Sequence, residues 1–272
     1  MSVSPAPGPF RALSLDLWFT AYYHEAEDEA RWEQARLACL RESLVLPDGR
    51  RADEGAIESS LREVYARLEP ATSLRTWTDP ATLITAVAET LGARPRQPLA
   101  AAASALSAAG LEASPPRANP EAVELVRALR HRGVPTVLVT NSARRAVTWA
   151  DFLRRHAGPE VAAVVSSCDV GRGKPDPAIF REAARCLGLP VSKMLHVGDR
   201  WELDVAGALG AGCGAVLYRG LWDRYPPGTH LPTDPPERGL ERVLVVDRLD
   251  ALLRPDLWEA PPSSRERADR PG

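Results

Sequence analysis

The side chains best suited to chemistry in this chain are acidic residues at the ends of short apolar runs. Asp16 closes the run Ala12–Asp16, Asp199 directly follows Met194–Gly198, and Asp204 lies in the next turn. Carboxylate oxygens are the ligands that hard cations such as Mg²⁺ prefer. A carboxylate beside such a cation can also attack phosphorus. The pattern therefore predicts a Mg²⁺ site formed by the three aspartates, with Asp16 as the nucleophile.

Two further segments end in polar groups of the same kind. Thr140 and Asn141 close the run that starts at Pro135, and Lys174 lies in the Gly- and Pro-rich segment 171–177. We expect Thr140 and Asn141 to bind a phosphoryl group, helped by free N–H groups at the start of the next helix. Lys174 would orient Asp16 and stabilise the transferring group. Each residue alone would be an ordinary strand-end polar residue, but the set in this order indicates phosphoryl chemistry.

These side chains can meet only if the apolar runs form one sheet. Continuous apolar runs of four to six residues are typical of strands buried on both faces, and hence of a parallel sheet. The expected strands are Ala12–Asp16, Pro135–Thr140, Val161–Ser166, Met194–Gly198, Ala215–Tyr218 and Val243–Asp247. Helix starts at Asn119-Pro120 and Asp176-Pro177 alternate with them. This alternation predicts a doubly wound, Rossmann-like α/β core with its ligands at the carboxyl ends of the strands.

The stretch from about Tyr22 to Ser114 breaks the alternation, because it contains helical patterns and no convincing strand. The expected helices are Glu25–Leu46, Glu54–Leu68, Pro80–Leu91 and Pro98–Ala109. We therefore predict an α/β core over 10–21 and 116–254, interrupted by a helical domain over 22–115. The Pro-rich ends, 1–9 and 255–272, are poor in apolar residues and are predicted to be disordered tails.

Composition narrows the class of protein. The formal net charge of −2 predicts no nucleic-acid partner, and no apolar run is long enough to cross a bilayer. The start of the chain lacks the features of a signal peptide. The four cysteines form no CxxC pair, which argues against a zinc site and for reduced thiols. We expect a cytoplasmic enzyme with a small-molecule substrate, and a homodimer through exposed helices stays open.

The motif residues resemble those of the haloacid dehalogenase superfamily of hydrolases. The resemblance covers about Arg11–Asp16 and Pro120–Gly220. It is strongest in Lys174-Pro175-Asp176-Pro177, in His196-Val197-Gly198-Asp199 with Asp204, and in Val139-Thr140-Asn141. It implies that the helical insert is a cap between the first two motifs, which closes over the site and selects the substrate. It also implies a small phosphorylated substrate, Mg²⁺ as cofactor, and a metal contact through the backbone carbonyl of residue 18.

The chain departs from the family at the first motif. Phosphatases of this group carry Asp-x-Asp-Gly-Thr, whereas this chain has Asp16-Leu17-Trp18-Phe19-Thr20. In the family the second Asp is the general acid/base, and the indole of Trp18 can neither give nor take that proton. The backbone carbonyl of Trp18 can still serve as a metal ligand. Loss of the acid would slow phosphate ester hydrolysis by roughly 10²–10⁴, unless a residue such as His24 replaces it.

Three functions are therefore weighed. The first is a Mg²⁺-dependent phosphatase acting through Asp16. The second is a dehalogenase-like hydrolase of a small haloacid, whose halide leaves without a proton and whose Arg near the halide would be Arg31 or Arg36. The third is a non-catalytic phosphate-binding or scaffold protein. Arg144 and Arg145 follow the second motif. They could attract anions, but a solvated helix face is the expected position for both.

Overall fold

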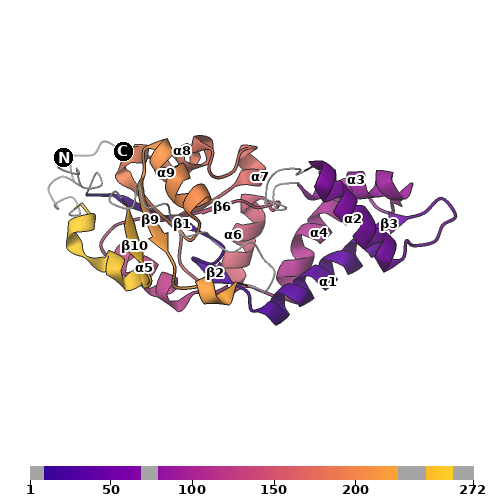
Figure 1. Cartoon of the computed structure of the whole chain (residues 1–272), viewed down its shortest axis with the longest axis horizontal. Coiled ribbons are helices and arrows are strands. Elements are labelled where there is room, and N and C mark those ends of the chain that lie inside the picture. Colours follow the sequence, from indigo (N-terminus) through magenta and orange to yellow (C-terminus); the bar gives the residue numbers. More distant parts are fainter. Residues whose placement is uncertain (1–8, 69–78, 226–242, 260–272) are drawn as a thin grey trace.

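Six parallel strands form the sheet at whose edge the predicted chemical residues lie. The computed structural model describes residues 9–68, 79–225 and 243–259 (Figure 1). Its main sheet has the order β10-β9-β8-β1-β6-β7, with every neighbouring pair parallel. The strands are β1 (Ala12–Asp16), β6 (Thr136–Thr140), β7 (Ala163–Ser166), β8 (Met194–Gly198), β9 (Gly214–Tyr218) and β10 (Leu244–Val246). The predicted doubly wound α/β core is confirmed, and the carboxyl ends of β1, β6 and β8 lie side by side.

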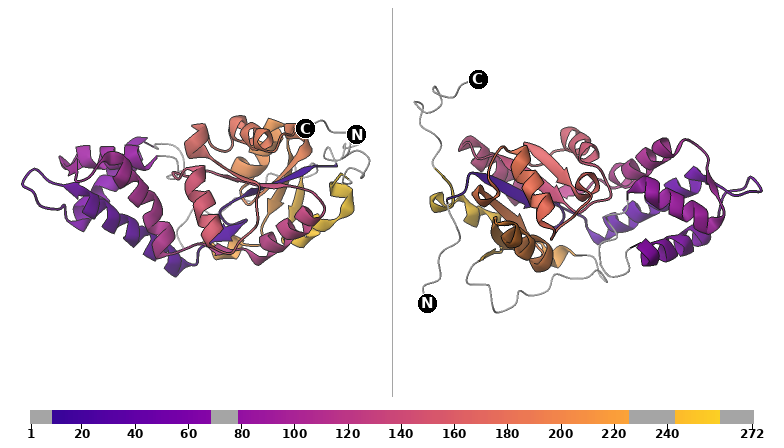
Figure 2. Two further views of the ribbon diagram at one scale, coloured as in Figure 1. Left: turned by 180° about the vertical axis from the view of Figure 1, so that it is seen from behind. Right: turned by 90° about the horizontal axis from the view of Figure 1, so that it is seen from above.

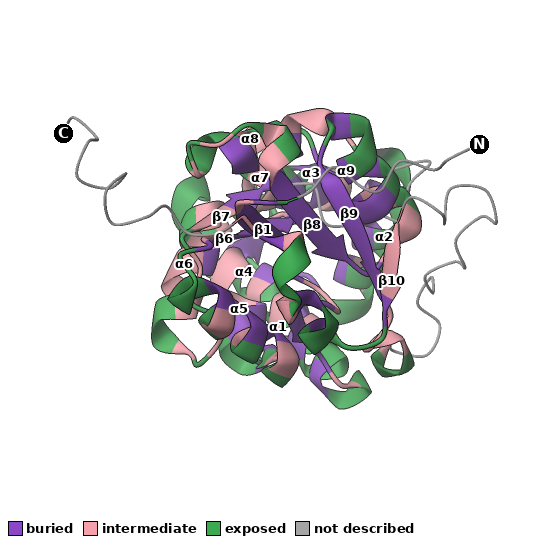
Figure 3. Cartoon of the chain, turned by 90° about the vertical axis from the view of Figure 1, so that its left-hand side faces the viewer, coloured by how far each residue is buried: buried purple, intermediate pink, exposed green. Residues whose placement is uncertain are grey.

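Helices cover both faces of this sheet. The core helices are α5 (Pro120–His131), α6 (Ala146–Arg155), α7 (Ser167–Val170), α8 (Pro177–Cys186) and α9 (Ala206–Ala211). Leu13 and Leu15 of β1 pack in one apolar cluster with residues of α5 and α6. Val137 and Val139 of β6 pack in a second cluster, with residues of α8 and α9. Alternate side chains of the strands thus serve opposite faces, and the sheet is the most deeply buried layer (Figure 3).

The predicted helix starts in the core are present. Asn119 accepts a hydrogen bond from the backbone N–H of Glu121 at 3.0 Å, and Asp176 accepts one from Ala178 at 2.9 Å. The amide of Asn119 also donates to the carbonyl of Thr20 at 2.9 Å. The start of α5 is therefore fastened to the turn that follows β1 and carries the first motif.

Helices α1 (Ala26–Ser43), α2 (Glu54–Leu68), α3 (Pro80–Leu91) and α4 (Leu99–Ala113) form the insert. They enclose an apolar cluster of their own, which includes Leu40, Ile57 and Val87. The insert extends from one end of the sheet, and the described chain ends lie at the other (Figure 2).

The expectation of no strands in the insert is wrong in detail. Near its entry and exit, β2 (Tyr22–Tyr23) pairs antiparallel with β5 (Arg117–Ala118). A second short pair joins β3 (Leu44–Val45) to β4 (Arg94–Pro95). Two residues are too few to show the alternation by which a strand is recognised in sequence.

The predicted C-terminal tail starts too early. Pro255–Leu257 form a short 3₁₀ turn, and the backbone N–H of Phe10 donates to the carbonyl of Leu257 at 2.7 Å. Trp258 is buried, and its indole N–H donates to the carbonyl of Leu252 at 2.7 Å. A buried aromatic side chain and backbone hydrogen bonds to Phe10 thus hold a segment of tail-like composition. Glu259 pairs with Lys193 at 2.5 Å, and Pro9 is exposed. The rest of both predicted tails lies outside the described residues.

Short 3₁₀ turns complete the described chain at Val191–Lys193, Trp222–Arg224 and Leu249–Leu253. No helix in the described ranges is long and apolar enough to span a membrane.

Candidate active site

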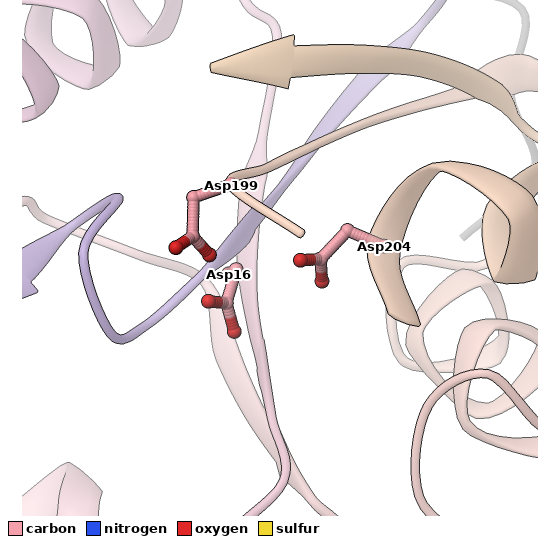
Figure 4. Close-up of side chains that lie close together, drawn as sticks. All are labelled: Asp16, Asp199 and Asp204. Carbon is pink, nitrogen blue, oxygen red and sulfur yellow. The ribbon is translucent and has the colours of Figure 1, made fainter. Parts of the chain in front are cut away.

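Three buried carboxylates converge where β1 and β8 end. Asp16 is the last residue of β1, Asp199 follows β8, and Asp204 lies in the wide π-type turn Trp201–Val205. Each can place one oxygen so that the three atoms lie within 4.8 Å of one another. Figure 4 shows the three side chains pointing toward a common point. The structure thus brings together the three aspartates that the sequence predicts.

The ammonium group of Lys174 lies against two of these carboxylates. It donates to Oδ1 of Asp16 and, at 2.6 Å, to Oδ1 of Asp204. All three side chains are nearly inaccessible to solvent. Burial raises the pKa of Asp16 to about 6, although Lys174 opposes that rise. Desolvation works to raise the pKa of Asp204 too, but the charge of Lys174 and the proximity of His196 hold it well below its usual range.

The backbone around Lys174 is held by Asn141. The side-chain carbonyl of Asn141 accepts from the backbone N–H of Lys174 at 2.7 Å, and its amide donates to the carbonyl of Lys174 at 2.9 Å. This double contact joins the end of β6 to the Lys174 loop. The side chain of Asn141 therefore positions the lysine, and its predicted contact with substrate stays a prediction.

Thr140 lies one residue beyond Val139, the residue of β6 that pairs with Asp16. Its side chain is fully buried, and its hydroxyl donates to the neighbouring carbonyl of Asn141 over a long 3.4 Å. Thr140 thus lies on the strand next to Asp16, as expected. Its hydrogen bond to Asn141 is long and weak, so the hydroxyl is able to donate to a better acceptor instead.

Asp204 folds back over the end of β8 because residue 198 is glycine. A Cβ atom at Gly198 would lie 2.3 Å from Cγ of Asp204, an overlap that no side chain could avoid. The backbone N–H of Arg200 donates to Oδ2 of Asp204 at 3.0 Å. Gly198-Asp199 is therefore a steric requirement of the carboxylate cluster.

His196 holds the side chain of Asp204 through a hydrogen bond. A carboxylate only accepts hydrogen bonds, so Nε2 of His196 carries the proton and donates to Oδ1 of Asp204 at 3.2 Å. Nδ1 then accepts from the hydroxyl of Ser14 at 2.8 Å. Burial lowers the pKa of His196, which agrees with a neutral ring. The sequence predicted only a core residue here, since a histidine inside an apolar strand gives no sign of its partner.

Asp199 has a partner that sequence reasoning missed. The hydroxyl of Tyr225 donates to Oδ2 of Asp199, and the indole N–H of Trp222 donates to its backbone carbonyl at 3.1 Å. Burial and the neighbouring Asp16 raise the pKa of Asp199 well above its usual value. The ring of Tyr225 stacks on Phe19 at 3.8 Å between centroids. The sequence gives no sign of this contact, because no regular strand or helix pattern leads to Tyr225.

Trp18 turns its side chain into an aromatic cluster, which is formed with His24, Trp32 and Trp149. Its ring centroid lies 5.0 Å from that of His24, 5.7 Å from Trp32 and 5.8 Å from Trp149. His24 is buried, and its Nε2 lies 3.1 Å from the carbonyl of Ser114. The residue at the place of the family's acid thus joins the core to the insert, and the role of its carbonyl as a metal ligand stays a prediction.

The aspartate cluster fits a hard divalent cation. All its donor atoms are carboxylate oxygens, the kind that Mg²⁺ and Ca²⁺ prefer. Among the described residues, Lys174 is the cationic side chain that forms ion pairs with the cluster, so three buried carboxylates face one ammonium group. Buried charge of one sign is unfavourable unless it is compensated. A divalent cation would supply the two missing charges.

Comparison with known proteins agrees with this geometry. The sequence model of a family described as haloacid dehalogenase-like hydrolase matches residues 47–212. A glyceraldehyde 3-phosphate phosphatase of Methanopyrus kandleri is 35% identical over 100 residues, which are 37% of this chain and 42% of that protein. A phosphoserine phosphatase of Thermus thermophilus is 37% identical over 106 residues, 38% of this chain and 41% of that protein. The chain thus matches about two fifths of the length of these relatives.

A solved structure extends the likeness to the whole fold. A 2-haloacid dehalogenase of Pseudomonas syringae superposes with a TM-score of 0.55 at 20% identity, over 89% of this chain and 96% of that chain. At this identity the likeness concerns the fold alone. These two curated relatives are named phosphatases and this structure is named a dehalogenase, so the choice of chemistry rests on the site residues.

The backbone at Phe19 has an unusual, left-handed conformation. Phe19 has φ = 54°, in the left-handed region that costs a residue with a Cβ atom about 1–2 kcal/mol. Phe19→Ala and Phe19→Gly both remove the ring that stacks on Tyr225. We expect the glycine variant to be the more stable of the two by about 1 kcal/mol in urea unfolding.

The matched control is the neighbouring pair Trp18→Ala and Trp18→Gly, because Trp18 has no positive φ. There alanine should be the more stable variant. An alanine preference at both positions would contradict a left-handed backbone at Phe19.

Proposed function

This chain belongs to the haloacid dehalogenase-like hydrolases, and on that premise we propose that it is a Mg²⁺-dependent phosphatase acting on a small phosphorylated metabolite through Asp16. The observation that carries the proposal is the buried cluster of Asp16, Asp199 and Asp204 around the ammonium group of Lys174. Its relatives with the names of phosphatases add support.

We assign the metal to Asp16, Asp199 and Asp204, with the backbone carbonyl of Trp18 as a further ligand. When bound, Mg²⁺ would neutralise negative charge on the phosphoryl group. The chain itself contributes a buried nucleophile. Lys174 keeps Asp16 ionised and in place, since its positive charge opposes the rise in pKa that burial causes.

The reaction would proceed in two steps. A carboxylate oxygen of Asp16 bonds to phosphorus, and the bond from phosphorus to the leaving oxygen breaks. Thr140 would donate its hydroxyl hydrogen to a phosphoryl oxygen, and Lys174 would balance charge on the group in transit. Water then cleaves the aspartyl phosphate, which releases phosphate and restores the Asp16 carboxylate.

Trp18 determines which substrates react well. The leaving oxygen of an alkyl phosphate needs a proton as it departs, and indole cannot supply it. His24 is held among Trp18, Trp32 and the carbonyl of Ser114. We therefore propose an enzyme that favours leaving groups which depart as stable anions.

The insert would act as a cap that excludes water during the first step. The cytoplasmic location, the absence of nucleic-acid and membrane partners and the option of a homodimer remain predictions from composition.

The dehalogenase alternative ranks lower. A halide needs neither a proton nor a metal to leave, so Trp18 would be harmless, but the Asp199 and Asp204 carboxylates would then have no purpose. Of the two arginines considered for the halide, Arg31 is largely exposed and pairs with Asp28 at 3.1 Å. Arg36 is largely covered and pairs with Glu33 at 2.9 Å.

The proposal predicts a steep dependence on the leaving group. With Mg²⁺, the parent should release phosphate from p-nitrophenyl phosphate faster than from ethyl phosphate by roughly 10²–10⁴, the usual contribution of a positioned acid. Trp18→Asp should narrow this gap by accelerating the hydrolysis of ethyl phosphate. Trp18→Asn should not, because its amide has the size of the Asp side chain but cannot act as an acid. Phosphate release is measured at equal enzyme concentration.

Asp16→Asn is the reference without a nucleophile. If the parent releases no more phosphate than this variant from either ester, the phosphatase proposal is wrong. Halide release from a 2-haloacid in EDTA would then favour the dehalogenase. Equal rates on both esters in the parent would show that another residue supplies the proton.

Metal binding is tested without turnover. Mg²⁺ at a hundredfold above its Kd should stabilise the parent by about 2.7 kcal/mol, visible as a higher Tm. Asp199→Asn should lose most of this shift, whereas Glu202→Gln, an exposed neighbour outside the cluster, should keep it.

The same variant has a second readout in EDTA. Burial raises the pKa of Asp199 in the folded protein. Above the pKa of Asp199 in the unfolded chain, this group therefore lowers the stability of the fold, and the loss grows as pH rises toward the folded-state pKa. At pH 7 without metal, Asp199→Asn should therefore be at least as stable as the parent. A clear loss of stability in EDTA would contradict the assignment of Asp199 as an uncompensated charge.

A further inference from the structure

Two arginines from different parts of the chain are near enough for their positive charges to interact. Arg36 lies in the middle of α1 in the insert, and Arg144 lies in the loop after β6 in the core. Arg144 was expected on a solvated face, and that expectation is wrong. Burial lowers the pKa of Arg144 to about 9, and the positive charge of Arg36 adds to the effect. Like charges brought together under partial burial are costly unless an anion joins them.

The two arginines differ in their partners. Arg36 donates to Glu33 at 2.9 Å and to the hydroxyl of Tyr65 at 2.9 Å. The side chain of Arg144 donates from Nε to the carbonyl of Ser107 at 2.7 Å. Within the described ranges, no carboxylate pairs with Arg144, and its two terminal nitrogens have no acceptor.

The guanidinium of Arg144 is nevertheless fixed. Its Cζ lies 4.3 Å from the ring centroid of Trp32 and 5.9 Å from that of Trp149. The contact with Ser107 holds one edge, and the ring of Trp32 covers one face. The remaining edge is the planar pair of N–H₂ groups that binds a carboxylate or a phosphate through two hydrogen bonds.

The position of this edge relates it to the nucleophile. Trp32 and Trp149, which contact Arg144, also contact Trp18, two residues after Asp16. Arg144 itself follows Thr140 by four residues at the neighbouring strand end. Arg144 therefore lies beside the aromatic cluster that contains Trp18, where the insert meets the core.

We propose that Arg144, with Arg36 behind it, binds a second anionic group of the substrate. The substrate class is then a small phosphate ester that also carries a carboxylate or a second phosphate. This inference rests on the proposed phosphatase function, because it takes the first phosphoryl group to be at Asp16.

The test measures binding, so that it does not depend on turnover. Phosphonates cannot be hydrolysed, and 3-phosphonopropionate differs from propylphosphonate in its carboxylate. Titration calorimetry with Mg²⁺ should show that the parent binds 3-phosphonopropionate at least roughly 10-fold more tightly, as expected for a bidentate charged contact. The contrast of 1,3-propanebisphosphonate with propylphosphonate tests a second phosphate in the same way.

Arg144→Ala should reduce these affinity ratios to about 1 and leave the binding of propylphosphonate unchanged. Arg144→Lys keeps the charge without the planar pair of donors, so it should retain part of the ratio. Arg145→Ala is the control, because Arg145 is exposed and pairs with Asp169 at 2.8 Å. This variant should keep the full ratio. Far-UV circular dichroism and Tm establish that each variant is folded, and Arg144→Lys carries the test if the alanine variant is not.

Two outcomes overturn the inference. One is a parent that binds neither 3-phosphonopropionate nor 1,3-propanebisphosphonate better than propylphosphonate. The other is a ratio that survives in Arg144→Ala or, where Arg144→Lys carries the test, a ratio that is undiminished in Arg144→Lys. Neither concerns the nucleophile, so a parent that still releases phosphate from aryl esters would keep the proposed function. Conversely, intact ratios without any phosphate release would remove the hydrolase and leave the anion site standing.

Discussion

The contact of the Lys174 ammonium group with Asp16 and Asp204 is the interaction on which the site depends. Taking these charges out of water is costly, and removing one partner of such a buried pair typically costs about 3–5 kcal/mol. The surrounding structure keeps them in register. Asn141 holds the lysine backbone from both sides, and His196 holds Asp204. The proposed nucleophile and the cation beside it are thus held in place by hydrogen bonds from neighbouring strands.

Much of this arrangement was predictable because parallel strands align their carboxyl ends. Asp16, Thr140 and Asp199 could be placed at one edge from apolar runs alone, since a strand buried on both faces is marked by composition. The Asn119-Pro120 and Asp176-Pro177 helix starts are equally local. The double contact of Asn141 with Lys174 joins residues 33 positions apart, and no periodic pattern encodes such a pairing.

Contacts that depend on loop geometry were out of reach for the same reason. Tyr225 reaches Asp199 from a segment without a regular pattern, and Trp258 anchors a segment whose composition is that of a tail. Arg144 and Arg145 are neighbours of the same type, yet one is held against Trp32 and the other is exposed beside Asp169. The two side chains reach different partners after β6, and no sequence pattern distinguishes them.

Trp18 links the chemistry to the insert. Replacing an acid by an indole removes a proton donor, but it also adds a large apolar surface that packs on Trp32 of α1 and on Trp149 of α6. Aromatic pairs of this geometry contribute about 0.5–1.5 kcal/mol each beyond the area they bury. The first motif therefore helps to hold the insert against the core, a task that a carboxylate could not perform.

The two ends of the candidate site depend on the insert to different degrees. The carboxylate end, with Asp16, Asp199, Asp204 and Lys174, comes from the core alone. At the arginine end, Arg144 comes from the core, but Trp32 and Ser107, which orient it, come from α1 and α4. A ligand that binds this oriented guanidinium would therefore favour the arrangement in which the insert contacts the core, by the difference between its affinities with and without that contact. Recognition of the far end of a substrate and exclusion of water from its phosphoryl group would then be one event, set by the same few contacts.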